Sequence, residues 1–447
     1  MSNTTPEPTA AISASAFVQS IGVNVHLWET GSTYTDLALV ESDLAYLGVD
    51  NLRDQLVTWS QTQPEYTALM ALGYKFDFVE EPVLQNISTF LSTINAFETT
   101  HPGSIKAIEG PNEVNLQPVT YNGGDGLANA AEFQQALYAA AHADPTLKGV
   151  PVYNLTLAYL DSAAYAGVGN LSGSANYANS HAYLPDSDTP EEGLSLIVPY
   201  AHLDASGLPT VITETGYDTN PADTYSGADQ TVQAKLTLDT LMDAFKAGVS
   251  QTYLYELFDD ASGDWGLFNA DGTPKLAATA IHNLTTLLAD PGSTASFTPG
   301  SLSYSIPNLP SNANQLLMEK STGQFDLVLW AEAQIWNPTT GTEITARTET
   351  TTVDFGQTQS LVEVFDPLDG TTPIATYTNV TSIQVALTDH PLIIEIPDAT
   401  ITKTTSGSTT SSTGSTSAST ETLGSTSATT EPPASTSVHH HLAHMWG

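Results

Sequence analysis

The sequence predicts an α/β protein, a (β/α)8 TIM barrel followed by an all-β sandwich domain and a disordered Ser/Thr-rich tail. Three observations predict this. Short apolar runs first alternate with helical periodicity, a period of two follows, and the last part is almost entirely Ser, Thr, Gly, Ala and Pro. We expect the barrel over residues 17–290, the sandwich over 295–397, a low-complexity linker over 404–437 and a His-rich end over 438–447.

The barrel prediction depends on eight apolar runs. They are residues 21–26, 49–53, 75–79, 105–109, 150–154, 178–182, 210–214 and 252–257. Apolar residues at helical spacing lie between them, for example over 37–47, 133–141, 232–245 and 276–288. Eight such units in about 270 residues match a closed eight-stranded barrel. A doubly wound sheet is the alternative, but no GxGxxG turn follows any of the runs.

After the barrel, the apolar pattern changes to a period of two. Alternating runs over 324–330, 360–365, 382–387 and 392–396 are the expected strands. Turn signals such as Asn337-Pro338 and Asp369-Gly370 separate them. Short strands with regular turns and no helical pattern predict a β-sandwich.

The C-terminal part has little apolar surface to bury. Residues 404–437 cannot offset the entropy lost on ordering, so we expect a disordered linker. The His cluster after it can bind a metal or form an unstructured end. We favour the unstructured end and expect no metal and no cofactor.

The charge balance restricts the partners. The 447 residues include 10 Lys+Arg and 49 Asp+Glu, which gives a net charge of −39. Such a surface repels phosphate backbones and anionic lipids, and no apolar run reaches the roughly 18 residues that span a bilayer. The lack of cysteine excludes thiol catalysis, CxxC zinc sites and disulfides. We expect a monomer with a neutral partner, and neither nucleic acid nor a membrane span.

The location of the protein in the cell has two interpretations. The N-terminal residues show no basic segment followed by an apolar one, so they do not resemble a secretory signal. Abundant Ser and Thr with few Lys are nevertheless typical of exported proteins. We expect an extracellular or cell-surface protein, with a cytoplasmic one as the alternative.

Polar residues cluster at the predicted strand ends, where barrels of this type carry their active sites. They are His26, Arg53, Glu80, Glu81, Asn112, Glu113, Asn154, His181, Tyr183, Glu214 and Glu256. Glu113 follows the fourth strand and Glu214 ends the seventh. Because these strands lie three apart around a closed barrel, the two carboxylates can meet over its mouth. Glycoside hydrolysis needs such a pair, one to protonate the leaving oxygen and one to attack the sugar or activate water.

These residues resemble those of clan A, the large clan of retaining (β/α)8 glycoside hydrolases. The matching residues are Arg53, Asn112-Glu113, His181-Ala-Tyr183, Thr213-Glu214-Thr-Gly216 and the passage 253–272. The chain is most similar to family 39 and its uncharacterised relatives, and less similar to family 5. The resemblance covers residues 17–290, and an appended β-sandwich is common in the clan.

The resemblance implies that Glu113 is the general acid/base and Glu214 the nucleophile. It also implies that Asn112 binds the sugar 2-hydroxyl and that His181 and Tyr183 help to keep Glu214 ionised.

The pairing of Arg53 with Glu214 has support within the chain, because Arg53 is the only arginine of the barrel. Each candidate also has a structural interpretation. Arg53 can form a rim salt bridge, His181 and His26 can be core histidines, and the two glutamates can be solvated loop residues.

Aromatic side chains on the same predicted loops are candidates for packing against sugar rings. They are Trp28, Trp59, Tyr121, Tyr217 and Trp265, and ordinary packing is the alternative for each. Many clan members have a Trp at the end of strand eight, where this chain has Tyr255-Glu-Leu257. Trp265 is the candidate replacement.

The sequence therefore predicts a retaining β-glycoside hydrolase that works by double displacement through a glycosyl-enzyme intermediate, in polysaccharide degradation. A neutral or weakly charged poly- or oligosaccharide is the expected substrate, because the barrel offers a single arginine for an anionic one. A transglycosylase with the same residues is a close variant. A non-catalytic carbohydrate-binding surface protein on a degenerate barrel is the alternative. The chain has no GxSxG, HExxH or P-loop lysine motif.

Overall fold

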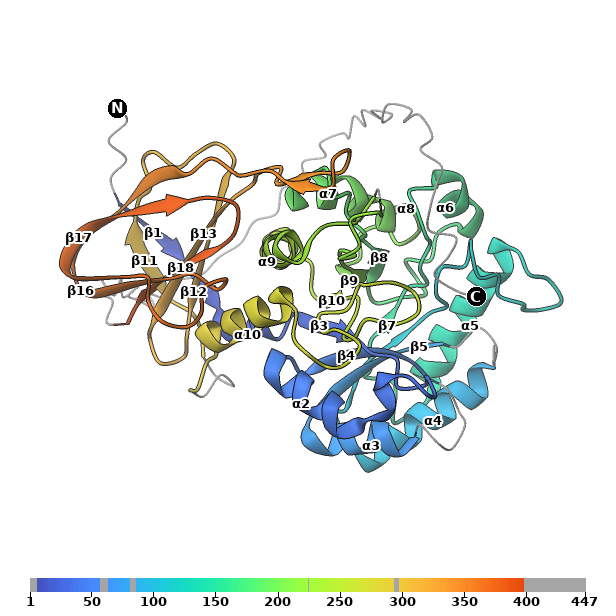
Figure 1. Cartoon of the computed structure of the whole chain (residues 1–447). Coiled ribbons are helices and arrows are strands. Elements are labelled where there is room, and N and C mark those ends of the chain that lie inside the picture. The colour runs from blue at the N-terminus through green and yellow to red at the C-terminus, as the bar shows by residue number, and fades with distance from the viewer. Residues whose placement is uncertain (1–5, 57–62, 81–85, 224, 293–296, 398–447) are drawn as a thin grey trace, which may run out of the picture. The chain divides into compact units, whose positions relative to one another are not determined.

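The computed structural model describes residues 6–56, 63–80, 86–223, 225–292 and 297–397, and Figure 1 labels its elements. Trp59, Glu81, the linker 404–437 and the His-rich end 438–447 lie outside the described residues. None of the described helices is both long and apolar enough to span a membrane.

Eight parallel strands form the barrel, in the order β7-β6-β5-β4-β3-β10-β9-β8. They are β3 (Ile21–Asn24), β4 (Asn51–Leu56), β5 (Lys75–Glu80), β6 (Ile105–Glu109), β7 (Val152–Tyr153), β8 (Ala178–His181), β9 (Thr210–Thr215) and β10 (Thr252–Leu254). A parallel bridge between Tyr153 and Tyr177 joins the two ends of this order. The sheet is thereby closed, which confirms the barrel and excludes the open doubly wound sheet.

Helices connect the strands. They are α1 (Ala14–Val18), α2 (Leu37–Leu47), α3 (Gln63–Leu72), α4 (Ile87–Thr100), α5 (Leu127–Ala143), α6 (Ser162–Val168), α7 (Pro190–Ile197), α8 (Ala201–Asp204), α9 (Gln230–Lys246) and α10 (Leu276–Leu288), with 3-10 turns η1 (Thr33–Thr35) and η2 (Val198–Tyr200). Local signals set their ends. The carboxylate of Asp36 accepts the Leu39 N–H at the start of α2, and Gly48 ends the helix with a left-handed φ of 69°.

The predicted β-sandwich is also present. Its main sheet has the order β17-β16-β18-β13-β12-β2, and two further pairs are β1-β11 and β14-β15. The strands are β1 (Glu7–Ala10), β2 (Ile12–Ser13), β11 (Ser301–Tyr304), β12 (Ala313–Glu319), β13 (Phe325–Ala331), β14 (Trp336–Asn337), β15 (Thr342–Glu343), β16 (Glu349–Phe365), β17 (Ala375–Leu387) and β18 (Leu392–Ile396). Alternate residues of these strands, such as Phe325, Leu327 and Leu329, share one apolar core.

The N-terminal strands belong to the sandwich and not to the barrel. Strand β1 pairs antiparallel with β11, and β2 pairs parallel with β12. Figure 1 shows β1, in blue, beside β11. The sequence analysis assigned no element before residue 17, because this pairing joins segments far apart in the chain. The predicted domain bounds stay predictions.

Candidate active site

The structure brings Glu113 and Glu214 together with His181 at the C-terminal ends of β6, β9 and β8. One carboxylate oxygen of each glutamate and Nδ1 of His181 all lie within 4.8 Å of one another. His181 Nδ1 is 2.9 Å from Glu113 Oε1 and 3.5 Å from Glu214 Oε2. Two carboxylates predicted from separate strands therefore face one shared histidine.

A glycine beside each glutamate allows the backbone to pass closely. Gly110 ends β6 directly before Pro111, and an added Cβ would collide with the side-chain amide of Gln134. Gly216 lies two residues after Glu214, and a Cβ there would collide with the carbonyl oxygen of Tyr255. Glu113 itself has a left-handed φ of 40°. Such a conformation is uncommon for a residue with a side chain and is often found at functional sites.

Arg53 lies between the side chains of the site and donates a hydrogen bond from each of its five N–H groups. Its Nε and Nη2 bind the two carboxylate oxygens of Glu109 at 2.8 and 2.9 Å. Its Nη1 donates to Glu214 Oε1 at 2.6 Å and to Asn24 Oδ1 at 2.9 Å. The remaining Nη2 hydrogen goes to Asn112 Oδ1 at 2.8 Å. The predicted contact with Glu214 is present, and Arg53 also forms a salt bridge with Glu109 that lies buried inside the barrel and not at its rim.

Glu109 is the partner that the sequence analysis missed. It is fully buried and binds Arg53 through both carboxylate oxygens, in addition to the expected pairing of Arg53 with Glu214. Burial and the negative charge of Glu109 raise the pKa of Asp77. The sequence does contain a feature that points to Glu109: it is an acidic residue at the last position of a predicted barrel strand, where a side chain can point into the barrel.

Glu214 is ionised because charged neighbours outweigh its burial. Burial alone raises its pKa, but the charges of His181 and Arg53 and the hydrogen bonds from Tyr183 and Arg53 lower it below the usual value. Tyr183 OH donates to Glu214 Oε2 at 2.7 Å. For His181, burial lowers the pKa, but the charges of Glu214 and Glu113 outweigh it and the pKa is raised.

A second polar cluster lies at the ends of β3 and β10, which are neighbours in the barrel. His26 Nδ1 is 3.1 Å from Glu256 Oε2 and 3.5 Å from Asp260 Oδ2. Tyr34 OH donates to the same Glu256 oxygen at 3.2 Å. Burial raises the pKa of Glu256 to about 7, although His26 opposes it. His26 thus shares the barrel mouth with Glu113 and Glu214, and its contact with substrate stays a prediction.

Among the described residues, two groups of side chains have donor atoms close enough to hold a metal ion. They are His26, Glu256 and Asp260, and Glu113, His181 and Glu214. In both groups the histidine Nδ1 faces a carboxylate oxygen at about hydrogen-bond distance. A cation would have to displace the proton shared there.

The aromatic candidates have different environments. Trp28 is half-buried, with its ring centroid 6.1 Å from that of His26, so part of it faces the mouth. Trp265 is 2% exposed and packs edge-to-face on Tyr183 at 5.2 Å. It supports Tyr183, and its direct contact with sugar stays a prediction. Tyr121 packs edge-to-face on Phe133 of α5, which is ordinary packing.

The prediction for Tyr217 is wrong. Its side chain is 2% exposed and lies in an apolar cluster with Val232 of α9 and Trp336. Its hydroxyl lies 3.4 Å from Thr240 Oγ1, also on α9. The residue follows β9 closely, but the chain turns its ring toward the outer helix and not toward the mouth.

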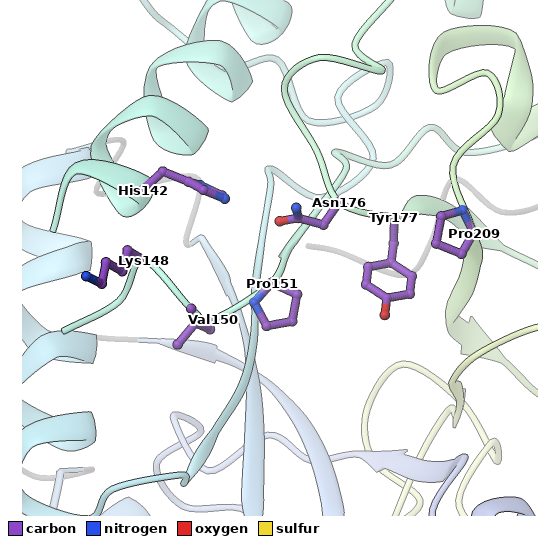
Figure 2. A pocket seen from close by; sticks show the side chains of 8 residues that line it. His142, Lys148, Val150, Pro151, Asn176, Tyr177 and Pro209 are labelled. Carbon is purple, nitrogen blue, oxygen red and sulfur yellow. The ribbon is translucent and has the colours of Figure 1, made fainter. Parts of the chain in front are cut away.

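A polar pocket of about 340 Å³ lies at the opposite end of the barrel (Figure 2). Its lining residues are His142, Lys148, Gly149, Val150, Pro151, Asn176, Tyr177 and Pro209, which lie just before β7, β8 and β9 or near the end of α5. Figure 2 shows His142 pointing toward Asn176 and Lys148 pointing away from it. None of these described lining residues is acidic, so the pocket lacks the carboxylate pair of the other face.

No protein-family model and no curated protein matches the chain. Among solved structures, it is similar to a monomeric beta-xylosidase from Caulobacter crescentus CB15, with TM-score 0.54 and 14% identity over 88% of this chain and 98% of that one. A glycoside hydrolase family 30 subfamily 8 xylanase from Clostridium acetobutylicum matches with TM-score 0.47 and 10% identity over 87% and 97% of the two chains. An active-site mutant of a beta-1,3-glucanosyltransferase from Rhizomucor miehei matches with TM-score 0.44 and 13% identity over 57% and 96%. The similarity to the xylosidase shows a shared fold, and the assignment to family 39 stays a prediction.

Proposed function

We propose that the chain is a retaining glycoside hydrolase that acts on β-linked, neutral or weakly charged poly- or oligosaccharides. The observation that carries the proposal is the pair of Glu113 and Glu214, which share His181 but have different partners. Glu214 receives hydrogen bonds from Arg53 and Tyr183, whereas the carboxylate of Glu113 faces only His181 among the hydrogen bonds of the described side chains. Two carboxylates in different environments can take the two roles that the reaction needs.

The separation of the two carboxylates supports retention. Their nearest oxygens lie within 4.8 Å. Retaining enzymes hold the two carboxyl groups about 5–5.5 Å apart, whereas inverting enzymes keep about 6.5–9.5 Å to admit a water molecule. This spacing is shorter than that of inverting enzymes, so direct attack by one carboxylate fits better.

In the first step, ionised Glu214 attacks the anomeric carbon and Glu113 protonates the departing glycosidic oxygen. Arg53 and Tyr183 hold Glu214 in place with one hydrogen bond to each oxygen. When the ester forms, Glu214 loses its negative charge. Glu113 then removes a proton from water, or from an acceptor sugar in a transfer reaction, and the ester is cleaved.

Asn112 has a fixed orientation that fits a sugar hydroxyl. Its amide oxygen accepts from Arg53 Nη2, so its amide nitrogen is the group that can donate to the substrate. A hydrogen bond to the 2-hydroxyl strengthens in the transition state and contributes to the rate.

The test compares wild type, Glu113→Gln and Glu214→Gln on aryl β-glycosides and on soluble β-glucans and β-xylans. We expect turnover by wild type and a loss of about 10⁴-fold or more in Glu214→Gln, as is usual for a nucleophile. Incubation with a 2-fluoro glycosyl donor and mass spectrometry of the peptides should find the label on Glu214. Arg347→Lys, at an exposed site of the sandwich, is the matched control.

Other outcomes would contradict the proposal in distinct ways. A label on another residue would refute the role of Glu214. Equal glycan binding by all variants, with no turnover by wild type on the whole panel, would show a carbohydrate-binding protein instead.

A further inference from the structure

The loops after β6 and β7 form one unit beside Glu113. The N–H groups of Glu113 and Val114 donate to Oγ1 and O of Thr156 at 2.9 and 3.0 Å, and the Thr156 N–H donates to Pro111 O at 3.1 Å. The side chain of Asn115 and the backbone of Ala158 exchange two hydrogen bonds of 2.8 Å. The acid/base loop is thus fixed to the loop that carries Ala158 and Tyr159.

Tyr159 stands out in two ways. Its φ is 64°, a left-handed conformation that is unfavourable for a residue with a side chain. It is also 45% exposed, and it is the only aromatic residue among the exposed large hydrophobic side chains of the described residues. Tyr183, Tyr255 and Trp265, beside the catalytic pair, are all nearly buried. An exposed ring on a strained backbone is a candidate for a binding role.

The proposed reaction indicates which ligand could bind the Tyr159 ring. The general acid must contact the glycosidic oxygen, so the leaving-group sugar lies on the side of the loop that carries Glu113. Strands β6 and β7 are neighbours in the sheet, whereas Glu214 and the His26 cluster belong to β9, β10 and β3. Tyr159 therefore lies on the leaving-group side of the mouth. Leu116, 44% exposed on the partner loop, adds apolar surface there.

We propose that Tyr159, together with Leu116, is a platform for the sugar on the leaving-group side of the scissile bond. The C–H face of a neutral pyranose packs on an aromatic ring, so the ligand is a neutral β-linked oligosaccharide that extends past the cleavage point. In a transfer reaction the acceptor sugar occupies the same platform. This inference rests on the proposed glycoside hydrolase function.

The test separates the leaving-group side from the chemical step. Tyr159→Asn removes the ring and suits a left-handed backbone, and Tyr159→Trp keeps an aromatic face. Each variant is assayed on a β-glycosyl fluoride, whose leaving group needs no platform, and on an oligosaccharide with the same glycone. Leu203→Ala, at a 55% exposed position of α8, is the matched control.

We expect kcat/KM of Tyr159→Asn on the oligosaccharide to fall about tenfold, mainly because KM rises. A change of about tenfold is what the loss of one aromatic contact usually causes. Hydrolysis of the fluoride should stay within about twofold of wild type. Tyr159→Trp should keep most of the oligosaccharide activity, and Leu116→Ala should lose a smaller factor. If Tyr159→Asn fails to fold, Leu116→Ala and Tyr159→Trp decide the question.

Three outcomes would overturn the platform. In the first, Tyr159→Asn cleaves the oligosaccharide as well as wild type does. In the second, its kcat/KM falls by the same factor on the oligosaccharide and on the fluoride. In the third, wild type cleaves only the fluoride. If wild type cleaves neither substrate, the proposed function itself fails, and the platform falls with it.

Discussion

Two buried carboxylates, Glu214 in the barrel mouth and Asp243 on α9, have pKa values that are shifted in opposite directions, although burial raises both. Both are at most 6% exposed. The positive charges of His181 and Arg53 outweigh the burial of Glu214 and hold its pKa below the usual value. Burial and the negative charge of Glu332 raise the pKa of Asp243 to about 9. Burial raises the pKa of both groups, and only at Glu214 do positively charged neighbours reverse the shift.

The region around Asp243 joins the barrel to the sandwich. Trp330 Nε1 of β13 donates to Asp243 Oδ1 at 2.9 Å. Burial and the charges of Glu332 and Asp243 also raise the pKa of Asp239, one turn earlier on α9. The nearby Lys246 donates to Asn314 Oδ1 of β12 and lies 3.6 Å from Glu191 Oε1. On the same helix, Lys235 also pairs with Glu343 and Asp389 of the sandwich. The contact between the two domains thus includes carboxyl groups of raised pKa, such as Asp243, whereas Glu214 has a lowered one.

The largest effect should come from Arg53→Lys, which replaces the five-donor guanidinium beside Glu214 with an ammonium group that cannot reach all of its partners. A lysine has three N–H donors for the five acceptors that Arg53 satisfies, so buried charge on Glu109 or Glu214 is left without a partner. We expect the free energy of unfolding to fall by about 3–5 kcal/mol and the activity to be lost. Denaturant unfolding and kcat/KM measure the two effects.

Arg347→Lys is the control for this change, because Arg347 is the other arginine and is exposed. It should leave both quantities unchanged. Wild-type activity in Arg53→Lys would show that the guanidinium does not keep Glu214 ionised. The guanidinium would then not be the cause of the difference in pKa between Glu214 and Asp243.

Tyr183→Phe should have an intermediate effect, because it removes one hydrogen bond from ionised Glu214. A hydrogen bond to a charged group is worth about 1.5–3 kcal/mol, so kcat/KM should fall about 10- to 150-fold. The pKa of Glu214 should rise, and the acid limb of the pH profile of kcat/KM should shift to higher pH. An unshifted acid limb would exclude a role of Tyr183 in ionising Glu214.

The smallest effect should come from Asp243→Asn, and it depends on pH. The pKa of Asp243 is about 9 in the folded protein and about 3.9 in the unfolded chain. Between about pH 3.9 and about pH 9 the folded protein therefore binds one more proton at Asp243 than the unfolded chain does. This contribution to stability is present at low pH and is lost as the pH rises toward 9. Asn keeps an acceptor for Trp330 without ionising, so the variant should be more stable than wild type at pH 8 by about 1–3 kcal/mol.

Thermal unfolding of Asp243→Asn at pH 5, 7 and 8.5 checks this expectation. Exposed Asp125→Asn is the control and should follow wild type at each pH. The contribution of Glu214 to stability depends on pH in the opposite direction, because a lowered pKa gives stability that is lost as the pH falls. A variant whose pH dependence matches wild type would show that Asp243 is ionised in the folded protein.

Much of the candidate site could be predicted from the sequence. The ends of β4, β6 and β9 follow from apolar runs, and these runs alone place Arg53, Glu113 and Glu214 at one face of the barrel. The structure brings these three side chains, with His181 and Tyr183, into one hydrogen-bonded centre. Tyr217 was misplaced because a residue's distance along the chain from a strand end does not fix the direction of its side chain.

The sequence by itself determined the eight barrel strands, the later strands with a period of two and the acidic residues at the strand ends, because these are local patterns of a few residues. The tertiary structure decided that Arg53 binds Glu109 with two N–H groups, that residues 7–13 join the sandwich, and that Asp243 retains a proton. Each of these depends on groups far apart in the chain. Burial and neighbouring charge exist only once the chain has folded.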